Sequence, residues 1–209
     1  MRDAVVAIDV AVLVPPSIAG SAGELNRVLA GQRPDALRLD DTHLAHVTLA
    51  QQFVERARLE DLFAELDRIL RHEPAIFLRV AGTVVDRGTV LFTIERTPDL
   101  HRLHEQIMDA LEPFESPDDG AAAFQADGER IRPQDVAWVR NYREEAAYLH
   151  YLPHVTIGHT DQARAVTIGA AAGRPIEAQG DRVAVCRLGR FCTCRAVLRE
   201  WRLGAVAGP

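Results

Sequence analysis

The tetrad His-Val-Thr-aliphatic occurs twice in the chain, at residues 46–49 and 154–157, about half a chain apart. Each copy lies in a short apolar run that predicts a β-strand. Side chains on a strand alternate between its two faces, so His and Thr point one way and the two aliphatic residues point the other way. Helices can cover the aliphatic face, whereas a buried strand has no need for histidine. The repeat therefore predicts two strands that each present one imidazole and one hydroxyl.

The rest of the chain alternates between strand and helix patterns. Strands are predicted at 4–13, 44–50, 76–85, 89–95, 136–141, 153–159, 182–190 and 195–203. The turn sequence at 86–88 lies between apolar runs and predicts a hairpin, and the last two strands form a second hairpin. Hairpins require antiparallel pairing, which predicts an α+β fold rather than a doubly wound parallel one.

Helices are predicted between these strands. Ser21 and Glu24 have the spacing of a capping box, which predicts a helix from there to about residue 31. Leucines at helical spacing predict a helix within 58–72. Thr97 followed by proline predicts the start of a further helix, which runs to about residue 114. A shorter helix is expected at about 161–172.

The segment 113–133 is rich in proline, glycine and acidic residues and has no clear period. We interpret it as a linker between two lobes of a single domain that spans 1–209. Each lobe would then contain a strand with one tetrad, a helix that follows it, and a hairpin. Outside the tetrads the two halves share little sequence, so the duplication is one of architecture.

Every one of the 24 basic residues is arginine, and the chain contains no lysine. This excludes the P-loop, the protein kinase site and nucleotide ligation through a lysyl-adenylate, because each requires a lysine. Arginine-only, alanine-rich usage is typical of a GC-rich bacterial genome. The net charge of −6 argues against a track for long nucleic acid but is compatible with a compact anionic ligand.

Three further features concern location and metals. No apolar run approaches the roughly 20 residues needed to cross a bilayer, and Asp3 and Asp9 interrupt the apolar N-terminus, which predicts a first strand rather than a signal peptide. A cytoplasmic protein is therefore expected. The cysteines Cys186, Cys192 and Cys194 are too few and too clustered for a disulfide framework, and their spacing does not favour zinc.

The residue types of the tetrads suit phosphodiester chemistry. One neutral imidazole can take a proton from the attacking water or hydroxyl, and one protonated imidazole can give a proton to the leaving oxygen. The usual pKa of histidine, near 6.5, allows opposite states after small shifts. Threonine hydroxyls can donate to the phosphate oxygens. The alternative is a metal enzyme that uses His46, His154 and a carboxylate such as Asp161, although metal sites seldom recruit threonine.

The tetrads at 46–49 and 154–157 resemble the paired His-x-Thr-x motifs of the 2H phosphoesterases, which include 2′-5′ RNA ligase-like proteins and cyclic nucleotide phosphodiesterases. The runs "AVVAIDV", "GTVLFTIERTPDLHRLHEQIMDAL" and "YLPHVTIGH" are also similar to segments of that family. The resemblance implies two pseudo-symmetric lobes of antiparallel sheet, with outer helices, around a central groove. It also implies no metal or other cofactor. In this family His46 and His154 would be acid and base, with Thr48 and Thr156 on the phosphate.

Four residues near the motifs are candidates for substrate binding. Phe53 and Tyr151 lie close to the tetrads and could stack on a nucleobase. Tyr142 and Arg143 could reach the phosphate from the strand that precedes the second tetrad.

Together these features favour a metal-independent enzyme acting on nucleotides or RNA ends that carry a 2′,3′-cyclic phosphate or a 2′-5′ linkage. Hydrolysis is favoured over ligation because it needs only water as the second substrate. Net joining needs two bound ends, and the acidic balance offers no track for them. Ligation and a non-catalytic nucleotide-binding module on the same fold remain alternatives. Neither a membrane nor an obligate protein partner is expected.

Overall fold

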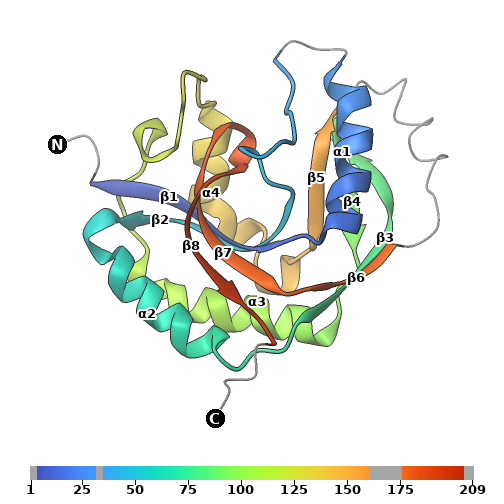
Figure 1. Ribbon diagram of the computed structural model, residues 1–209. Helices are drawn as coiled ribbons and strands as arrows, with labels where there is room; N and C mark the ends of the chain where they lie inside the picture. The colour runs from blue at the N-terminus through green and yellow to red at the C-terminus, as the bar shows by residue number, and fades with distance from the viewer. Residues whose placement is uncertain (1–3, 32–34, 161–175, 205–209) are drawn as a thin grey trace.

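The computed structural model describes residues 4–31, 35–160 and 176–204 (Figure 1). Two four-stranded antiparallel sheets organise them. The first sheet has the order β2-β1-β7-β8, with β1 at Val5–Leu13, β2 at His46–Glu55, β7 at Arg182–Leu188 and β8 at Cys194–Arg202. The second sheet has the order β5-β4-β3-β6, with β3 at Ile76–Asp86, β4 at Thr89–Ile94, β5 at His154–His159 and β6 at Ile176–Gly180. The α+β prediction with antiparallel sheets is confirmed.

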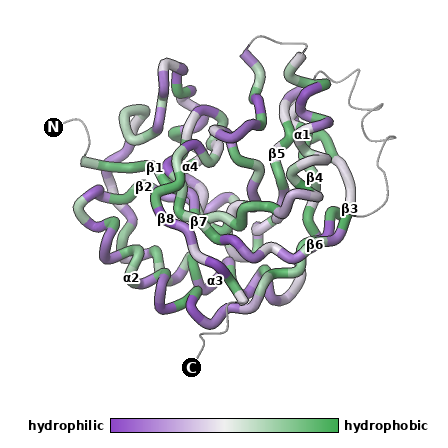
Figure 2. Tube along the Cα trace, in the orientation of Figure 1, coloured by the Kyte–Doolittle hydropathy of each residue, from purple (hydrophilic) through white to green (hydrophobic). Residues whose placement is uncertain are grey.

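Helices lie on the outside of both sheets (Figure 1). They are α1 at Pro16–Ala30, α2 at Leu59–Leu70, α3 at Pro98–Leu111 and α4 at Pro133–Glu145. The first helix packs on β5 and β6, whereas α3 and α4 contact β2 and α2 packs on α3. Short 3₁₀ turns occupy Arg56–Arg58, Glu112–Phe114, Ala121–Ala123, Tyr148–His150 and Arg190–Cys192. Figure 2 shows hydrophobic stretches along β1 and β5 and hydrophilic turns on the outer side of α2.

One predicted element and the start of one predicted helix were wrong. Residues 136–141 belong to α4 and not to a strand. Pro133 begins this helix, and Asp135 accepts a hydrogen bond from the Arg132 backbone at 3.1 Å. An apolar run this short does not distinguish helix from strand, and these cap residues decide the outcome. The capping box at Ser21 does not form either. Helix α1 begins earlier, at Pro16, and the Ser21 hydroxyl donates within the helix.

The two sheets alternate along the chain. The chain leaves the first sheet after β2, builds the second sheet from β3 to β6, and returns for β7 and β8. The segment 113–133 lies between α3 and α4 and runs along the first sheet, where Glu115 bridges Val54 and Phe124 contacts Phe53. The two sheets, each with one tetrad, therefore do not correspond to the two halves of the sequence. The assignment of 1–209 to one domain stays a prediction, and the expected helix at 161–172 lies outside the described residues.

One hydrophobic cluster connects the two sheets. It includes buried side chains from both of them, such as Val10 and Leu49 from the first and Leu78 and Val155 from the second. The backs of both tetrad strands are thus held by the same core. Because a packed interior transmits small displacements, this shared core fixes the tetrads relative to each other. Within the described residues, no helix is both long enough and apolar enough to span a membrane.

Candidate active site

The two tetrads lie on strands β2 and β5, which contact each other between the sheets. In both tetrads the two aliphatic side chains are completely buried, whereas the His and Thr side chains are partly exposed. The alternation of faces predicted from the sequence is therefore confirmed. The charge of His46 lowers the pKa of His154, so the two imidazoles lie within electrostatic reach. The structure brings together the four residues that the repeat singled out.

A β-bulge interrupts each tetrad at the same position. In the pairing of β1 with β2 the register skips Leu49, and in the pairing of β4 with β5 it skips Ile157. These are the fourth residues of the two tetrads. A bulge bends the strand locally and changes the direction of neighbouring side chains, and bulges are common beside active sites. The duplication therefore extends to the backbone around the threonines.

A helix side chain satisfies the backbone carbonyl at each bulge. The ring of His104 on α3 lies with Nδ1 2.6 Å from the Leu49 oxygen, and Asn26 on α1 donates to the Ile157 oxygen at 2.6 Å. The other ring nitrogen of His104 accepts from the Tyr148 N–H at 2.8 Å. Burial lowers the pKa of His104 to about 4, so the ring is neutral. His104 and Asn26 are structural counterparts that hold the two bulges.

The two tetrad imidazoles are oriented in the same way. His46 Nδ1 lies 2.7 Å from the carbonyl oxygen of Leu44, and His154 Nδ1 lies 2.8 Å from that of Leu152. A carbonyl can only accept, so Nδ1 carries the proton in both rings. This assignment leaves Nε2 as the nitrogen available for chemistry on each ring.

A buried carboxylate distinguishes the first tetrad from the second. Asp9 on β1 is 0% exposed, and its Oδ2 lies 3.3 Å from His46 Nε2. The same oxygen accepts a hydrogen bond from the Thr48 hydroxyl at 2.8 Å and from the Gln51 amide at 2.6 Å. Oδ1 is buried and has no hydrogen-bond partner among the described residues. The sequence placed Asp9 in the first strand, but only the pairing of β1 with β2 shows that it faces His46.

The two imidazoles have opposite pKa shifts. Burial would lower the pKa of His46, but the hydrogen bond and charge of Asp9, with the Leu44 carbonyl, raise it above its usual value. Burial lowers the pKa of His154, and the nearby charge of His46 acts in the same direction. At any pH near neutrality, His46 is therefore more protonated than His154. One ring is suited to donate a proton and the other to accept one.

Asp9, His46 and Cys194 also form a group that could hold a metal ion, with ligand atoms all within 4.8 Å of one another. A thiol must lose its proton to bind a metal. Burial and the neighbouring Cys186 raise the pKa of Cys194 well above its usual range, which opposes that loss. This group does not include His154, and Asp161 lies outside the described residues. The three cysteines are free.

The aromatic residues expected to stack on a base are buried. Phe53 is 3% exposed and meets Phe124 edge to face, with the ring centres 6.0 Å apart. Tyr151 is 2% exposed and stacks on His104 at 3.8 Å, while its hydroxyl donates to the Thr48 carbonyl at 3.0 Å. Tyr151 therefore connects the loop before β5 to the first tetrad. The geometry supports a packing role for both rings rather than base stacking.

Tyr142 and Arg143 lie on helix α4 and not on the strand that we expected. Tyr142 is 4% exposed and belongs to the core. Arg143 pairs with Glu115 at 3.0 Å and donates to the Met108 carbonyl and the Tyr148 hydroxyl. These contacts hold α4 against α3. They do not support a direct role on the phosphate for either residue.

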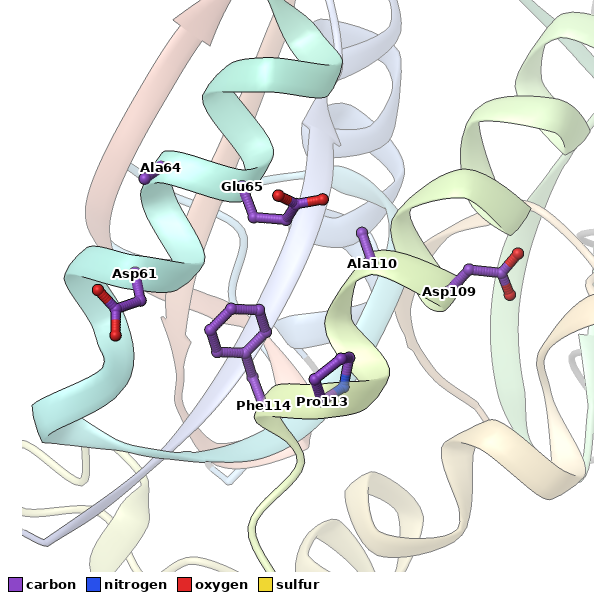
Figure 3. A pocket seen from close by; sticks show the side chains of 7 residues that line it. All are labelled: Asp61, Ala64, Glu65, Asp109, Ala110, Pro113 and Phe114. Carbon is purple, nitrogen blue, oxygen red and sulfur yellow. The ribbon is translucent and has the colours of Figure 1, made fainter.

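A surface hollow shown in Figure 3 is lined by none of the tetrad residues. It lies between α2 and α3 and has a volume of about 540 Å³. Three of its side chains are carboxylates, those of Asp61, Glu65 and Asp109. This negative lining would repel a phosphate. The hollow is therefore a poor candidate for the site of an anionic substrate.

The chain is an α+β protein with two antiparallel sheets, and each sheet contains one strand with a His-x-Thr motif. The family model described as the 2′-5′ RNA ligase superfamily matches residues 14–190. The match spans most of the sequence, and the chain belongs to this superfamily. The 2H resemblance drawn from the tetrads is thus confirmed. No curated protein sequence matches the chain significantly.

Solved structures have the same fold over nearly their whole length. TT0787 of Thermus thermophilus aligns with a TM-score of 0.59 at 17% identity, covering 95% of this chain and 98% of that one. E. coli LigT complexed with NADP+ has a TM-score of 0.54 at 16% identity, covering 96% and 99%. LigT complexed with 3′-AMP has a TM-score of 0.52 at 15% identity, with the same coverage. At these identities the likeness establishes the fold alone.

Proposed function

We propose that this chain is a metal-independent phosphoesterase that acts on 2′,3′-cyclic phosphates or 2′-5′ linkages of nucleotides and RNA ends. One observation carries the proposal. Two imidazoles on facing strands are each anchored through Nδ1, and their pKa values shift in opposite directions. A matched acid and base is what phosphodiester hydrolysis requires in the absence of a metal.

The proposed reaction assigns a separate role to each histidine. Neutral His154 takes a proton through Nε2 from water as the water oxygen bonds to phosphorus. The bond from phosphorus to one ribose oxygen breaks, and protonated His46 gives up its contact with Asp9 Oδ2, 3.3 Å away, to donate its Nε2 proton to that oxygen. One proton is taken up and one is released, so the pair returns to its starting state by proton exchange with water.

The two threonines are not equivalent in this reaction. Thr156 can donate its hydroxyl proton to a non-bridging phosphate oxygen, where negative charge must be held. The Thr48 hydroxyl already donates to Asp9. Because a hydroxyl has one proton to donate, Thr48 can serve the phosphate only by giving up that bond. We therefore assign the main phosphate contact to Thr156.

The choice of substrate rests on family membership and on nucleotide ligands in similar folds. LigT has been crystallised with 3′-AMP, ATP and NADP+. A nucleoside 3′-monophosphate is one of the two products that opening a 2′,3′-cyclic phosphate can give. Hydrolysis remains our first choice because the net charge of −6 offers no track for two RNA ends. We also propose the cytoplasm as its compartment, which cell fractionation would test.

Two other functions are compatible with the family. The description of the matching family favours 2′-5′ RNA ligation, which would require joining of two RNA ends in an assay. A non-catalytic nucleotide-binding module would bind nucleotides without turnover, and binding would survive the loss of either imidazole. The protonation difference between His46 and His154 favours catalysis over such a module.

The test is hydrolysis of the four nucleoside 2′,3′-cyclic phosphates in EDTA, with the 2′- and 3′-monophosphate products resolved. Wild type, His46→Ala and His154→Ala would be compared with His150→Ala, an exposed histidine four residues before the second tetrad. We expect turnover in EDTA that each tetrad substitution abolishes and His150→Ala preserves. Wild-type turnover that requires added metal would refute the metal-independent mechanism. No turnover under any condition would refute cyclic phosphodiesterase activity.

A further inference from the structure

We propose that Asp9 makes the site selective for ligand charge, so that it accepts a monoanionic phosphodiester and rejects a dianionic phosphomonoester. The inference rests on the proposed function, because it concerns the same site and names the charge state of its substrate. It would explain how substrate and product are distinguished although they share a base, a ribose and a phosphorus atom.

Asp9 Oδ2 already has the partners that a phosphate oxygen would seek. It accepts from the Thr48 hydroxyl at 2.8 Å and from the Gln51 amide at 2.6 Å, and it lies 3.3 Å from His46 Nε2. A hydroxyl, an amide and an imidazolium are also common donors to phosphate. The carboxylate therefore acts as a resident anion beside the first tetrad. An incoming phosphate must share these donors with it.

Among the described residues, the carboxylate in contact with a tetrad imidazole is on the first-tetrad side of the site, whereas Asp86 acts on His154 through its charge alone. In β1, Asp9 pairs with Gln51, the third residue after the first-tetrad threonine. In β4, the residue at the equivalent position is Thr89, which pairs with His159, the third residue after the second-tetrad threonine. Because Thr89 is uncharged, the second tetrad lacks a counterpart of Asp9.

The first tetrad offers no surplus of positive charge to a ligand. Asp9 Oδ2 lies 3.3 Å from His46 Nε2, so a protonated His46 already faces a carboxylate. A cyclic phosphodiester carries one negative charge, whereas a phosphomonoester, whose second pKa is about 6, approaches two negative charges well above that pH. Among the residues that the structure describes, the positive group beside Asp9 is His46, which Asp9 already contacts. The second charge of the monoester therefore faces a completely buried carboxylate, where solvent screening is weak. The product of ring opening is therefore repelled, and we expect rapid product release.

The test compares two ligands that differ only in phosphate charge, 2′-deoxyadenosine 3′-monophosphate and its methyl ester. Neither has the 2′-hydroxyl needed to form a cyclic phosphate. Calorimetric titration at pH 7.5 should show tighter binding of the methyl ester to wild type. In Asp9→Asn the affinity of the monoester relative to that of the methyl ester should rise by about tenfold or more. The monoester should also bring a proton to His46, because its second charge replaces that of Asp9.

Asp135→Asn is the matched control, since Asp135 is also a buried carboxylate, at 2% exposure, but is paired with Arg132. It should leave the affinity ratio unchanged. An affinity ratio in Asp9→Asn within twofold of the wild-type ratio would overturn the proposal. Failure of both ligands to bind wild type and Asp9→Asn would also overturn it.

A pH series on wild type alone keeps the proposal testable if Asp9→Asn does not fold. Between pH 7.5 and pH 5.5 the monoester loses its second charge, so its affinity should rise relative to that of the methyl ester. The ionisable groups in or near the site are Asp9, His46, His154, Cys194 and Asp86, the last of which acts on His154 through its charge. A proton gained by either imidazole over this range adds positive charge, which favours the more negative ligand and so changes the affinity ratio in the same direction. A ratio that stays constant over this range would contradict the inference. Both binding tests remain valid if the protein has no cyclic phosphodiesterase activity.

Discussion

The surroundings of the two tetrads match in backbone and differ in charge. In each, the imidazole Nδ1 contacts the carbonyl two residues earlier, a bulge follows the threonine, and a helix side chain satisfies the bulge carbonyl. Only the first tetrad has a carboxylate against its imidazole among the residues that the structure describes. The matching backbone contacts position both imidazoles. Asp9, which has no counterpart at the equivalent strand position, favours the protonated form of His46. The comparison separates placement of the catalytic groups from control of their protonation.

The largest expected effect is the loss of either imidazole. His46→Ala and His154→Ala should each lower kcat by about 10²- to 10⁴-fold, because each removes one partner of a general acid-base pair. The double substitution should cost little more than either single one, since the two rings act as a unit. Steady-state kinetics in EDTA checks this. Strictly multiplicative losses would show that the rings act independently.

Asp9→Asn should change the pH profile of kcat/KM. The reaction needs protonated His46, whose raised pKa keeps it protonated to higher pH, so activity falls on the alkaline side as pH passes that pKa. Removing the carboxylate lowers the pKa of His46 and should move the alkaline limb to lower pH. We expect about a tenfold loss at pH 8 and a much smaller one at pH 6. An unshifted alkaline limb would contradict the role of Asp9.

Thr89→Asp tests the comparison from the other side. It places a carboxylate at the position equivalent to Asp9, beside the second tetrad. The added charge should raise the pKa of His154, which acts in its neutral form, so the acidic limb should move to higher pH. We expect a few-fold loss of kcat/KM at pH 6 and little change at pH 8. Thr89→Asn, which lacks the charge, is the control and should leave the profile unaltered.

Asn26→Ala should have the smallest effect on catalysis. Asn26 donates to the carbonyls of Leu37 and Ile157 and accepts from the Leu39 N–H, so its loss leaves buried backbone groups unpaired. The free energy of unfolding should fall by about 1–3 kcal/mol, measured by urea denaturation. Per folded molecule, kcat should change only a few-fold. A loss in kcat as large as that of His154→Ala would assign the bulge a catalytic role.

The sequence was most informative about features that depend on a short local pattern. Alternation along each tetrad was enough to predict which face holds His and Thr, and hairpin turns were enough to predict antiparallel sheets. Local cap signals gave the start of α3 correctly but not that of α1, because two prolines at 15–16 begin that helix before Ser21. The run at 136–141 shows that a few apolar residues do not separate helix from strand.

The contact between Asp9 and His46 could not be predicted from the sequence, because the two residues lie in different segments of the chain. Asp9 lies on β1 opposite Gln51, and His46 begins β2 opposite Leu13. Their side chains come within 3.3 Å of each other only because the two strands pair in the same sheet. The burial of Phe53, Tyr142 and Tyr151 does not support their prediction as substrate contacts, for a related reason. Proximity in sequence to a tetrad does not show whether a ring faces the site or the core, and burial depends on helices α3 and α4.

The most direct test of the account is an NMR titration of the two tetrad imidazoles in the wild-type protein, with His46→Ala and His154→Ala used to assign the signals. The account predicts a pKa above the usual value of about 6.5 for His46 and one below it for His154. Titration of Asp9→Asn should then show a lower pKa for His46. Equal pKa values, or the reverse order, would contradict the assignment of acid and base and the role of Asp9 in setting it.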